Sequence, residues 1–430
     1  MEIQTIYQYF EECGVVTTDS RQCPEGSMFF ALKGASFNGN AFAEAALEKG
    51  CKYAVVDEEQ YVKDNPRIIL VDDVLTTLQQ LANFHRRRLG IPIIGITGTN
   101  GKTTTKELIA AVLRKKYQVL ATEGNLNNHI GVPLTLLKLS GSHEMAVVEM
   151  GASHPGDIKE LVDIAEPDYG MITNVGMAHL EGFGSFEGVV KTKCELYDFL
   201  REHGKHIIFM DQGNEHLKAH SNGLTVVPYG TEAEGLFVKG ALGPCEPFLT
   251  FKWMNEGEEY HVKTHLIGSY NLKNALAAIA IGRYFDVPSV DICEAIEEYV
   301  PHNNRSQLTE TEHNHLVVDA YNANPTSMRA ALDNFRIMNV PHKMVILGDM
   351  RELGTSSTEA HQNVVDYLSA CGFERIILVG EEFGKVNNGF EHYSDVNALK
   401  EVIQQHLPQD MYILIKGSNS MKLAQLQEIL

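Results

Sequence analysis

The sequence predicts an α/β protein of three domains: a small α/β unit, a central unit with a parallel sheet, and a Rossmann-like C-terminal unit. Two observations support this prediction. Short apolar runs typical of strands alternate with helical patterns along most of the chain. A chain of 430 residues also exceeds what a single hydrophobic core usually organises. We therefore expect domains at residues 1–88, 89–305 and 306–430.

The composition is that of an ordinary globular protein, with 44% hydrophobic and 21% charged residues. The net charge of −20 argues against binding to nucleic acid or anionic membranes. The seven cysteines include no C-x-x-C pair, which favours a reducing compartment over a disulfide framework. The first residues lack the basic and apolar segments of a signal peptide, and no run approaches the ~18 apolar residues of a membrane span. We expect a cytoplasmic monomer without membrane insertion.

The first unit shows strand-like runs at 53–56 and 68–71 and helical patterns at 40–49 and 75–88. We also expect a strand across 26–34 that ends at a glycine. A short segment rich in glycine and proline then leads into the central unit.

A glycine-rich turn between a strand and a helix is the strongest motif of the chain. The apolar run 93–97 leads into this turn, and a helical pattern continues to residue 113. Glycines let backbone N–H groups face phosphate oxygens, a lysine neutralises the β- and γ-phosphates, and a hydroxyl binds Mg²⁺. The common phosphate loop has glycine where this chain has Ile96, so an ordinary strand-to-helix turn is the alternative. The residues expected to bind a nucleotide here are Gly98, Thr99, Asn100, Gly101, Lys102, Thr103 and Thr104.

Polar residues follow the ends of the next central strands. Glu149 ends the strand at 146–149, and His179 follows the strand at 171–175. In parallel sheets the carboxyl ends of strands face the crevice where ligands bind. Thr103, Glu149 and His179 are therefore candidate ligands for one or two Mg²⁺ ions beside a nucleoside triphosphate. By itself, His179 would fit an ordinary surface or core position.

The rest of the chain continues the α/β pattern. The loop 122–133 is rich in amides and glycine, which suits ligand positioning better than a core. Residues 225–267 are rich in β-forming residues, and an alanine-rich helix follows. No G-x-G-x-x-G follows the first strand of the last unit, so we expect no dinucleotide site there. The strand candidates of this parallel unit are 316–319, 344–349, 376–380 and 412–417.

Four segments together resemble one known family. They read TGTNGKT, GNLNNHIGVP, EMG and NVGMAHLE, and lie at 97–103, 124–133, 149–151 and 174–181. They are similar to the Mur ligase family, ATP-dependent amide-forming enzymes of cell-wall precursor synthesis, and the resemblance spans the whole chain. Within the family, DAYNANPTSM at 319–328 and GDMRELG at 348–354 resemble the enzyme of the last ligation step. The Asp-Asn-Pro-Arg motif of the preceding ligase is absent.

The resemblance implies a reaction that joins D-alanyl-D-alanine to UDP-N-acetylmuramoyl-tripeptide with ATP and two Mg²⁺ ions. ATP would phosphorylate the terminal carboxylate of the tripeptide, and the dipeptide amine would attack the acyl phosphate. The tetrahedral intermediate would then collapse to amide and phosphate. Thr103 and Glu149 would bind the first Mg²⁺ and His179 the second, while Lys102 screens the phosphates.

Further residues receive roles only from the resemblance. Lys193 corresponds to a carbamylated lysine that helps hold the second metal, with Lys191 as the competing assignment and a solvated helix lysine as the alternative for both. Asn271 and Asn274 match residues that contact adenine, with helix capping at Asn271 as the alternative. Arg305 matches an arginine that reaches the nucleotide.

Substrate contacts are implied in the same way. Asp319, Tyr321 and Asn322 match residues near the nucleotide and the incoming amine, and Asp319 joins Lys102, His179 and Lys193 as an expected catalytic residue. Ser20 and Arg21 look like part of the UDP-binding unit, although Asp19 and Arg21 also fit a solvated turn. Asn125 and Asn128 are expected near the substrate. The family usually has Asp-Gly-His near Asn38-Gly39-Asn40, which leaves the substrate contact there open.

Three other functions compete with this interpretation. A folylpolyglutamate-synthase-like ligase would share the phosphate loop and the metal residues but would not need the UDP-type first unit. A P-loop switch or motor would hydrolyse nucleotide without an added amine. A catalytically inactive binding module is disfavoured, because Lys102, Thr103, Glu149 and His179 are all present.

Overall fold

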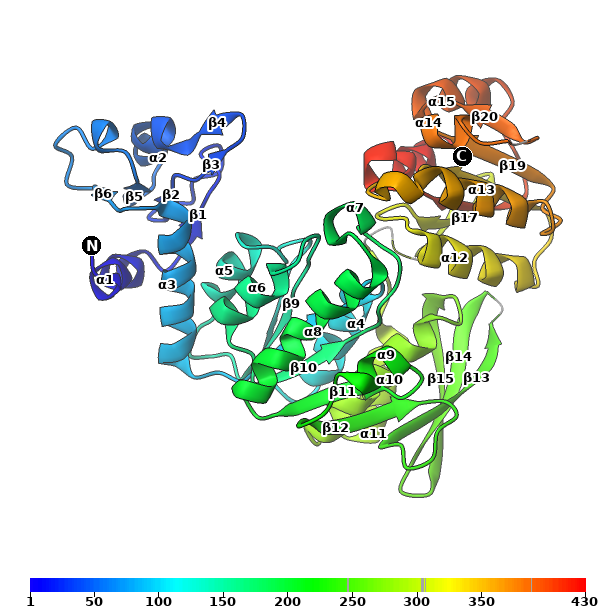
Figure 1. The fold of residues 1–430 in the computed structure, drawn as a ribbon, viewed down its shortest axis with the longest axis horizontal. Coiled ribbons are helices and arrows are strands. Elements are labelled where there is room, and N and C mark those ends of the chain that lie inside the picture. The colour runs from blue at the N-terminus through cyan, green and yellow to red at the C-terminus, as the bar shows by residue number, and fades with distance from the viewer. Residues whose placement is uncertain (246, 303–304, 306, 388) are drawn as a thin grey trace.

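Three main sheets organise the chain, and they lie in three successive lobes (Figure 1). The computed structural model describes residues 1–430 apart from 246, 303, 304, 306 and 388. Each lobe combines strands with helices, which confirms the predicted three-part α/β architecture. Within the described residues, no helix has the length and apolar character needed to cross a bilayer.

The first lobe contains a parallel sheet with the strand order β1-β2-β5-β6. Buried residues of α1 and α3 pack on one side of this sheet, and α2 packs beside β5. The elements are α1 (Ile3–Cys13), β1 (Val16–Thr17), β2 (Met28–Phe30), β3 (Lys33–Gly34), β4 (Phe37–Asn38), α2 (Ala43–Glu48), β5 (Tyr53–Val56), β6 (Ile68–Leu70) and α3 (Val74–Leu89), with short 3₁₀ helices at Gly39–Phe42 and Glu59–Tyr61.

The strand expected across 26–34 is shorter in the structure. It ends at Phe30, and the next residues form the separate β3–β4 hairpin. A Cβ at Gly39 would lie 2.2 Å from the carbonyl oxygen of Leu32, so only glycine lets the chain fold back this tightly. The prediction of one continuous strand was therefore wrong beyond Phe30.

Helix α3 connects the first and second lobes (Figure 1). The Asp73 side chain caps its N-terminus, and Gly90 ends it in the left-handed conformation with φ 61°. Its last turn binds the second lobe through Arg87, whose guanidinium donates to the Glu166 carboxylate. The predicted linker therefore follows a helix that is already docked on the second lobe.

The second lobe contains a sheet with the order β15-β14-β13-β12-β11-β10-β7-β9-β8. Strands from β8 to β13 are parallel, and β13, β14 and β15 are antiparallel. Strand β7 lies between β9 and β10, so the connections turn to opposite sides of it. Ligands bind at such a switch point in open α/β sheets, beyond the carboxyl ends of the strands.

The elements of the second lobe alternate strand and helix up to β12, then form the antiparallel strands and two helices. They are β7 (Ile93–Thr97), α4 (Lys102–Arg114), β8 (Val119–Ala121), α5 (Gly131–Leu136), β9 (Met145–Glu149), α6 (Asp157–Ala165), β10 (Tyr169–Ile172), α7 (Leu180–Phe183), α8 (Phe186–Glu202), β11 (Ile207–Asp211), α9 (Glu215–Ala219), β12 (Thr225–Gly230), β13 (Val238–Cys245), β14 (Phe248–Asn255), β15 (Glu258–Ile267), α10 (Asn271–Tyr284) and α11 (Ser289–Glu298).

The third lobe contains a sheet with the order β16-β17-β21-β18-β19-β20. All its pairs are parallel except β16 with β17, so the expectation of a parallel unit needs correction at that edge. Strands β16 and β20 were not predicted, because they are short and carry few apolar residues. The elements are β16 (Gln307–Glu310), β17 (Asn314–Asp319), α12 (Pro325–Ile337), β18 (Lys343–Gly348), α13 (Ser357–Leu368), β19 (Arg375–Val379), α14 (Glu381–Gly384), β20 (Glu391–Tyr393), α15 (Val396–Gln405) and β21 (Met411–Lys416), with 3₁₀ helices at Gly354–Ser356, Asn419–Met421 and Leu423–Glu428.

Candidate active site

The loop between β7 and α4 has the backbone shape that its glycines predict. Gly98 has φ 140°, and a Cβ there would lie 2.1 Å from Thr173 Oγ1. Gly101 has φ 78° and precedes α4, which has no side-chain cap. The Asn174 side chain accepts a hydrogen bond from the backbone N–H of Asn100 at 3.0 Å. The neighbouring strand end thus holds the loop, and the uncapped helix N-terminus can receive an anion.

Lys102 is the first residue of α4 and folds over this loop. Its Nζ donates to the carbonyl of Gly98 at 2.9 Å and to that of Thr99 at 3.2 Å. Burial lowers the pKa of Lys102, while the nearby Glu149 carboxylate acts in the opposite direction. Phosphate oxygens would be stronger partners for this ammonium than neutral carbonyls, because hydrogen bonds between charged groups are stronger.

Glu149 and Thr103 bring buried oxygens to the same edge of the sheet. Glu149 is 1% exposed and Thr103 is 4% exposed. Asn127 donates to Glu149 Oε1 at 2.8 Å. In the described part of the chain, Glu149 Oε2 and Thr103 Oγ1 have no hydrogen-bond partner. Such buried oxygens are costly without a partner, so this pair fits a hard cation such as Mg²⁺.

This site offers only a small number of side chains that could bind a cation, as judged from the described residues. No group of three or more His, Cys, Asp or Glu side chains that could hold a metal occurs among the described residues. Mg²⁺ usually takes one or two protein ligands and completes its shell with water and substrate phosphates. The site therefore fits a cation that binds together with a nucleotide.

His179 comes directly before α7 and has a left-handed backbone with φ 51°. Its Nδ1 contacts Oε2 of Glu352, which belongs to the third lobe. Burial lowers the pKa of His179, although Glu352 acts to raise it. The neutral imidazole that burial favours is the form that binds metal ions.

Lys193 lies on α8 and is 2% exposed, whereas Lys191 on the same helix is exposed. Lys193 Nζ lies 3.4 Å from the carbonyl oxygen of Ala152 and 5.4 Å from the centroid of the Phe183 ring. Burial lowers the pKa of Lys193 well below its usual range, and the charge of Lys102 adds to this effect. The structure thus distinguishes the two lysines, and only Lys193 is a buried amine.

Asn271 and Asn274 form a pair beside the phosphate loop. Asn274 Nδ2 donates to Asn271 Oδ1 at 2.8 Å, and Asn271 Nδ2 donates to the carbonyl of Ile267 at 2.8 Å. A Cβ at Gly101 would lie 2.8 Å from Asn274 Oδ1, so the pair touches the loop. The N-cap of α10 is Tyr270, without a side-chain capping bond. The alternative of helix capping by Asn271 is therefore wrong.

Two polar contacts involve third-lobe residues at this site, and one of them crosses to the second lobe. Asp319 and Lys416 face each other from the ends of β17 and β21, with Lys416 Nζ 2.6 Å from Asp319 Oδ2. Lys416 is only 1% exposed, so Asp319 balances a buried charge. Asn324 Nδ2 donates to Asn100 Oδ1 at 2.8 Å, which joins the third lobe directly to the phosphate loop.

A cavity of about 710 Å³ lies between the second and third lobes. The guanidinium of Arg305 stacks on the Tyr321 ring in its wall, 3.9 Å from the ring centroid. The predicted site residues that line the cavity are Thr99, Asn100, Gly101, Lys102, Thr104, Asn128, Glu149, His179, Asn271, Asn274, Arg305, Asp319, Tyr321 and Asn322. Residues far apart in sequence thus meet at one place.

Three family models match this chain, one in each lobe. The models described as "Mur ligase family, catalytic domain", "Mur ligase middle domain" and "Mur ligase, glutamate ligase domain" match residues 13–86, 96–282 and 304–419. The chain belongs to the Mur ligase family. This confirms the family that the sequence motifs indicate.

Individual relatives resemble this Mur ligase over nearly its whole length. UDP-N-acetylmuramoyl-tripeptide–D-alanyl-D-alanine ligase of Bacillus subtilis is 36% identical over 423 residues, which cover 96% of this chain and 92% of the relative. A crystal structure of MurF from Acinetobacter baumannii is 28% identical with a TM-score of 0.87, covering 99% of this chain and 97% of that one. MurF ligase from Thermotoga maritima in complex with ADP is 26% identical with a TM-score of 0.84, and the match covers 96% of each chain.

The substrate residues predicted in the first lobe of this Mur ligase lie outside the cavity. The exposed Arg21 binds Asp19, whose pKa falls to about 2 because of the hydrogen bonds that it accepts from Arg21. Ser20 is half-buried, and its carbonyl accepts a hydrogen bond from Lys49. Asn125 is exposed and also does not line the cavity. The structure therefore leaves the roles of Ser20, Arg21 and Asn125 as predictions.

Asn38 and Asn40, where the chain departs from the family pattern, donate hydrogen bonds to nearby carboxylates. Asn40 is fully buried and donates to Asp57 Oδ1 at 2.8 Å. Asn38 donates to Glu58 at 3.0 Å. Both amides thus bind the segment after β5.

Four residues of this site received no definite role from the sequence: Asn127, Asn324, Glu352 and Lys416. Asn127 and Asn324 stand inside the motifs that carry the resemblance, so their amides were available as a signal. Lys416 ends the apolar strand β21, where a lysine is unusual in a buried sheet, and its segment is similar to a family motif. Glu352 also lies within a quoted motif, but no local pattern predicts its contact with His179.

Proposed function

We propose that this chain is the ATP-dependent ligase that joins D-alanyl-D-alanine to UDP-N-acetylmuramoyl-tripeptide. The products are the pentapeptide precursor of peptidoglycan, ADP and phosphate. The observation that carries this proposal is the full-length match to the Bacillus subtilis enzyme of that name. The phosphate loop, the buried acid and the third-lobe residues around one cavity supply the groups that such a reaction needs.

The chemistry begins with a carboxylate, which is a poor electrophile until a phosphoryl group gives it a leaving group. Lys102 and the loop N–H groups would hold the ATP phosphates and screen their repulsion from the tripeptide carboxylate. The dipeptide amine would then attack the acyl phosphate, and the tetrahedral intermediate would release phosphate. Asp319, Tyr321 and Asn322 would position the amine from the third lobe.

We assign the cations as follows. Thr103 Oγ1 and Glu149 Oε2 would hold one Mg²⁺, and His179 a second. When bound, these ions would neutralise charge that develops on the transferring phosphoryl group. The support comes from the two unpartnered buried oxygens and from the neutral form that burial favours for His179.

We further propose that Lys193 is carbamylated and helps to hold the second cation. An amine must be neutral to attack carbon dioxide, and burial lowers the pKa of Lys193 well below its usual range. The resulting carbamate would carry a negative charge close to the position of the cation. Lys191 is exposed and offers no such environment.

The lobes receive separate roles in this proposal. Residues 1–88 would bind the UDP part of the substrate with Ser20 and Arg21, 89–305 would bind ATP, and 306–430 would deliver the amine. Asn271, Asn274 and Arg305 would contact the nucleoside, and Asn125 and Asn128 the peptide substrate. We propose a monomer that acts in the cytoplasm, where ATP is available.

A substrate panel tests the function directly. ADP release should require both UDP-N-acetylmuramoyl-tripeptide and D-alanyl-D-alanine, and mass spectrometry should find the joined product. Activity only with a folate and glutamate would favour the folylpolyglutamate-synthase-like alternative. ATP hydrolysis at the same rate without an added amine would favour a P-loop switch and overturn the proposal.

A further inference from the structure

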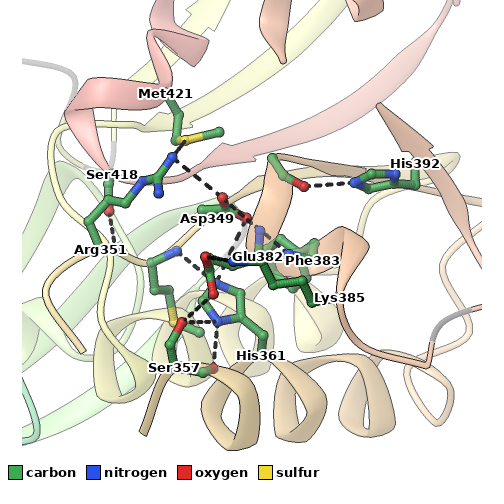
Figure 2. A network of polar contacts seen from close by, with 12 residues as sticks. Asp349, Arg351, Ser357, His361, Glu382, Phe383, Lys385, His392, Ser418 and Met421 are labelled. Carbon is green, nitrogen blue, oxygen red and sulfur yellow. Dashed lines mark hydrogen bonds and ion pairs between the residues drawn. The ribbon is translucent and has the colours of Figure 1, made fainter. Parts of the chain in front are cut away.

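Figure 2 shows a buried polar cluster in the third lobe. The cluster holds a loop whose residue Glu352 contacts His179. It contains Asp349 and His361, which are both 0% exposed, together with Ser418. None of these three residues lines the cavity, and the proposed mechanism does not use them. Their contacts fix one loop, residues 349–354, at several successive positions.

Asp349 follows β18 and binds the backbone at the start of α14. Its Oδ2 accepts a hydrogen bond from Glu382 N and its Oδ1 one from Phe383 N, each at 3.1 Å (Figure 2). A Cβ at Gly380 would lie 2.3 Å from Asp349 Cγ, so the carboxylate packs directly against backbone. The first residue of the loop is therefore tied to the end of the neighbouring strand.

His361 fixes the second residue of the loop. Its Nδ1 lies 2.7 Å from the carbonyl oxygen of Ser357, so Nδ1 carries the proton. Its Nε2 then accepts a hydrogen bond from Met350 N at 3.0 Å. Burial lowers the pKa of His361, in agreement with this neutral form. The third residue is fixed as well, because Arg351 N donates to Ser418 Oγ at 3.0 Å.

The tip of the loop docks on the second lobe. The carbonyl of Glu352 accepts a hydrogen bond from Glu181 N at 3.3 Å, and its carboxylate contacts His179 Nδ1. Glu352 and His179 both have left-handed backbones, with φ 63° and 51°. This conformation is unfavourable for residues with a Cβ and persists where surrounding contacts enforce it. The anchored side of the loop supplies such contacts.

We propose that Asp349 and His361 are positioning residues for the ligation step, which they serve by holding the loop so that Glu352 docks beside His179. The inference rests on the proposed function. The amine must meet the activated carboxylate between two lobes. If the loop docks loosely, Asp319 and its neighbours spend less time in the position that the ligation needs.

Steady-state kinetics on five variants tests this role. Glu352→Gln and His361→Leu should each lower kcat/KM for D-alanyl-D-alanine about tenfold, while the affinity for ADP with Mg²⁺ stays within about twofold. The double variant should lose little more than either single variant, because both changes act through one loop. His361→Gln keeps one donor and one acceptor and should recover most of the loss. Glu359→Gln removes the same charge from an exposed position of α13 and should behave as wild type.

A second measurement does not depend on turnover. Small-angle X-ray scattering of the nucleotide-free protein should give a larger radius of gyration for Glu352→Gln than for Glu359→Gln, because a docking contact is lost. If His361→Leu does not fold, Glu352→Gln and His361→Gln still decide the question. Wild-type kinetics in Glu352→Gln, or additive losses in the double variant, would overturn the inference. A wild-type enzyme that makes no amide would instead overturn the proposed function.

Discussion

The second and first lobes prepare their candidate sites in different ways. In the second lobe, Lys102 and Glu149 already face one cavity. The Asn174 side chain holds the loop before Lys102, and Asn127 donates to Glu149. In the first lobe, Arg21 is exposed and binds Asp19 in its own turn. This difference teaches that backbone and buried groups can form a candidate phosphate site before a ligand binds. A surface arginine instead needs the bound ligand to fix its position.

The largest expected effect concerns the candidate phosphate site of the second lobe. Lys102→Ala should lower kcat about 1,000-fold, because in the proposed mechanism the ammonium stabilises charge on the phosphates during transfer. The thermal midpoint should change little, since Lys102 Nζ donates to two carbonyls of its own loop. Amide formation followed by mass spectrometry, with melting by circular dichroism, checks both parts. Turnover close to wild type would show that the loop around Lys102 is not the phosphate site.

The second test removes the partner of a buried charge. Asp319→Asn should lower the free energy of unfolding by about 3 kcal/mol, because Lys416 is then left without its carboxylate in a buried position. Denaturant unfolding measures this change. Asp163→Asn is the matched control, since Asp163 and its partner Lys159 are both exposed. Equal stability losses in the two variants would contradict the argument from burial.

The third test separates two lysines of one helix. Lys193→Ala should lower activity 10- to 100-fold, because the proposed ligand of the second cation is lost. Excess bicarbonate should not restore activity, whereas formate should restore part of it by replacing the proposed carbamate. Lys191→Ala is the control and should behave as wild type. The opposite pattern would move the assignment to Lys191.

The smallest effect tests the first lobe. Arg21→Ala should raise KM for the UDP-linked substrate about tenfold without changing the thermal midpoint. Asp19 has a pKa of about 2 in the folded protein against an ordinary value of 3.8, so its pairing with Arg21 is complete above about pH 4 and is lost as the pH falls through 2. Above about pH 4 Asp19 stays ionised, so its titration should not change KM in that range. An unchanged KM in Arg21→Ala would mean that the UDP group binds elsewhere.

Much of the fold followed from local pattern. The run of buried residues in β7, the glycines after it and the helical pattern of α4 are adjacent in sequence, so the loop could be predicted with its residues. The short β16 and β20 escaped prediction because a few residues with mixed polarity give no periodic signal. The early end of β2 escaped because it depends on a close approach between Gly39 and Leu32.

The sequence by itself determined the alternation of strands and helices, the phosphate loop, the strand-end acid and the family to which the chain belongs. These features depend on neighbouring residues or on motifs that can be compared directly. Only the tertiary structure decided that Lys193 is buried while Lys191 is exposed, that Lys416 balances Asp319, and that Glu352 meets His179. Burial and charge pairing are set by which elements pack together, and residues on separate strands and lobes carry no record of that packing in their local sequence.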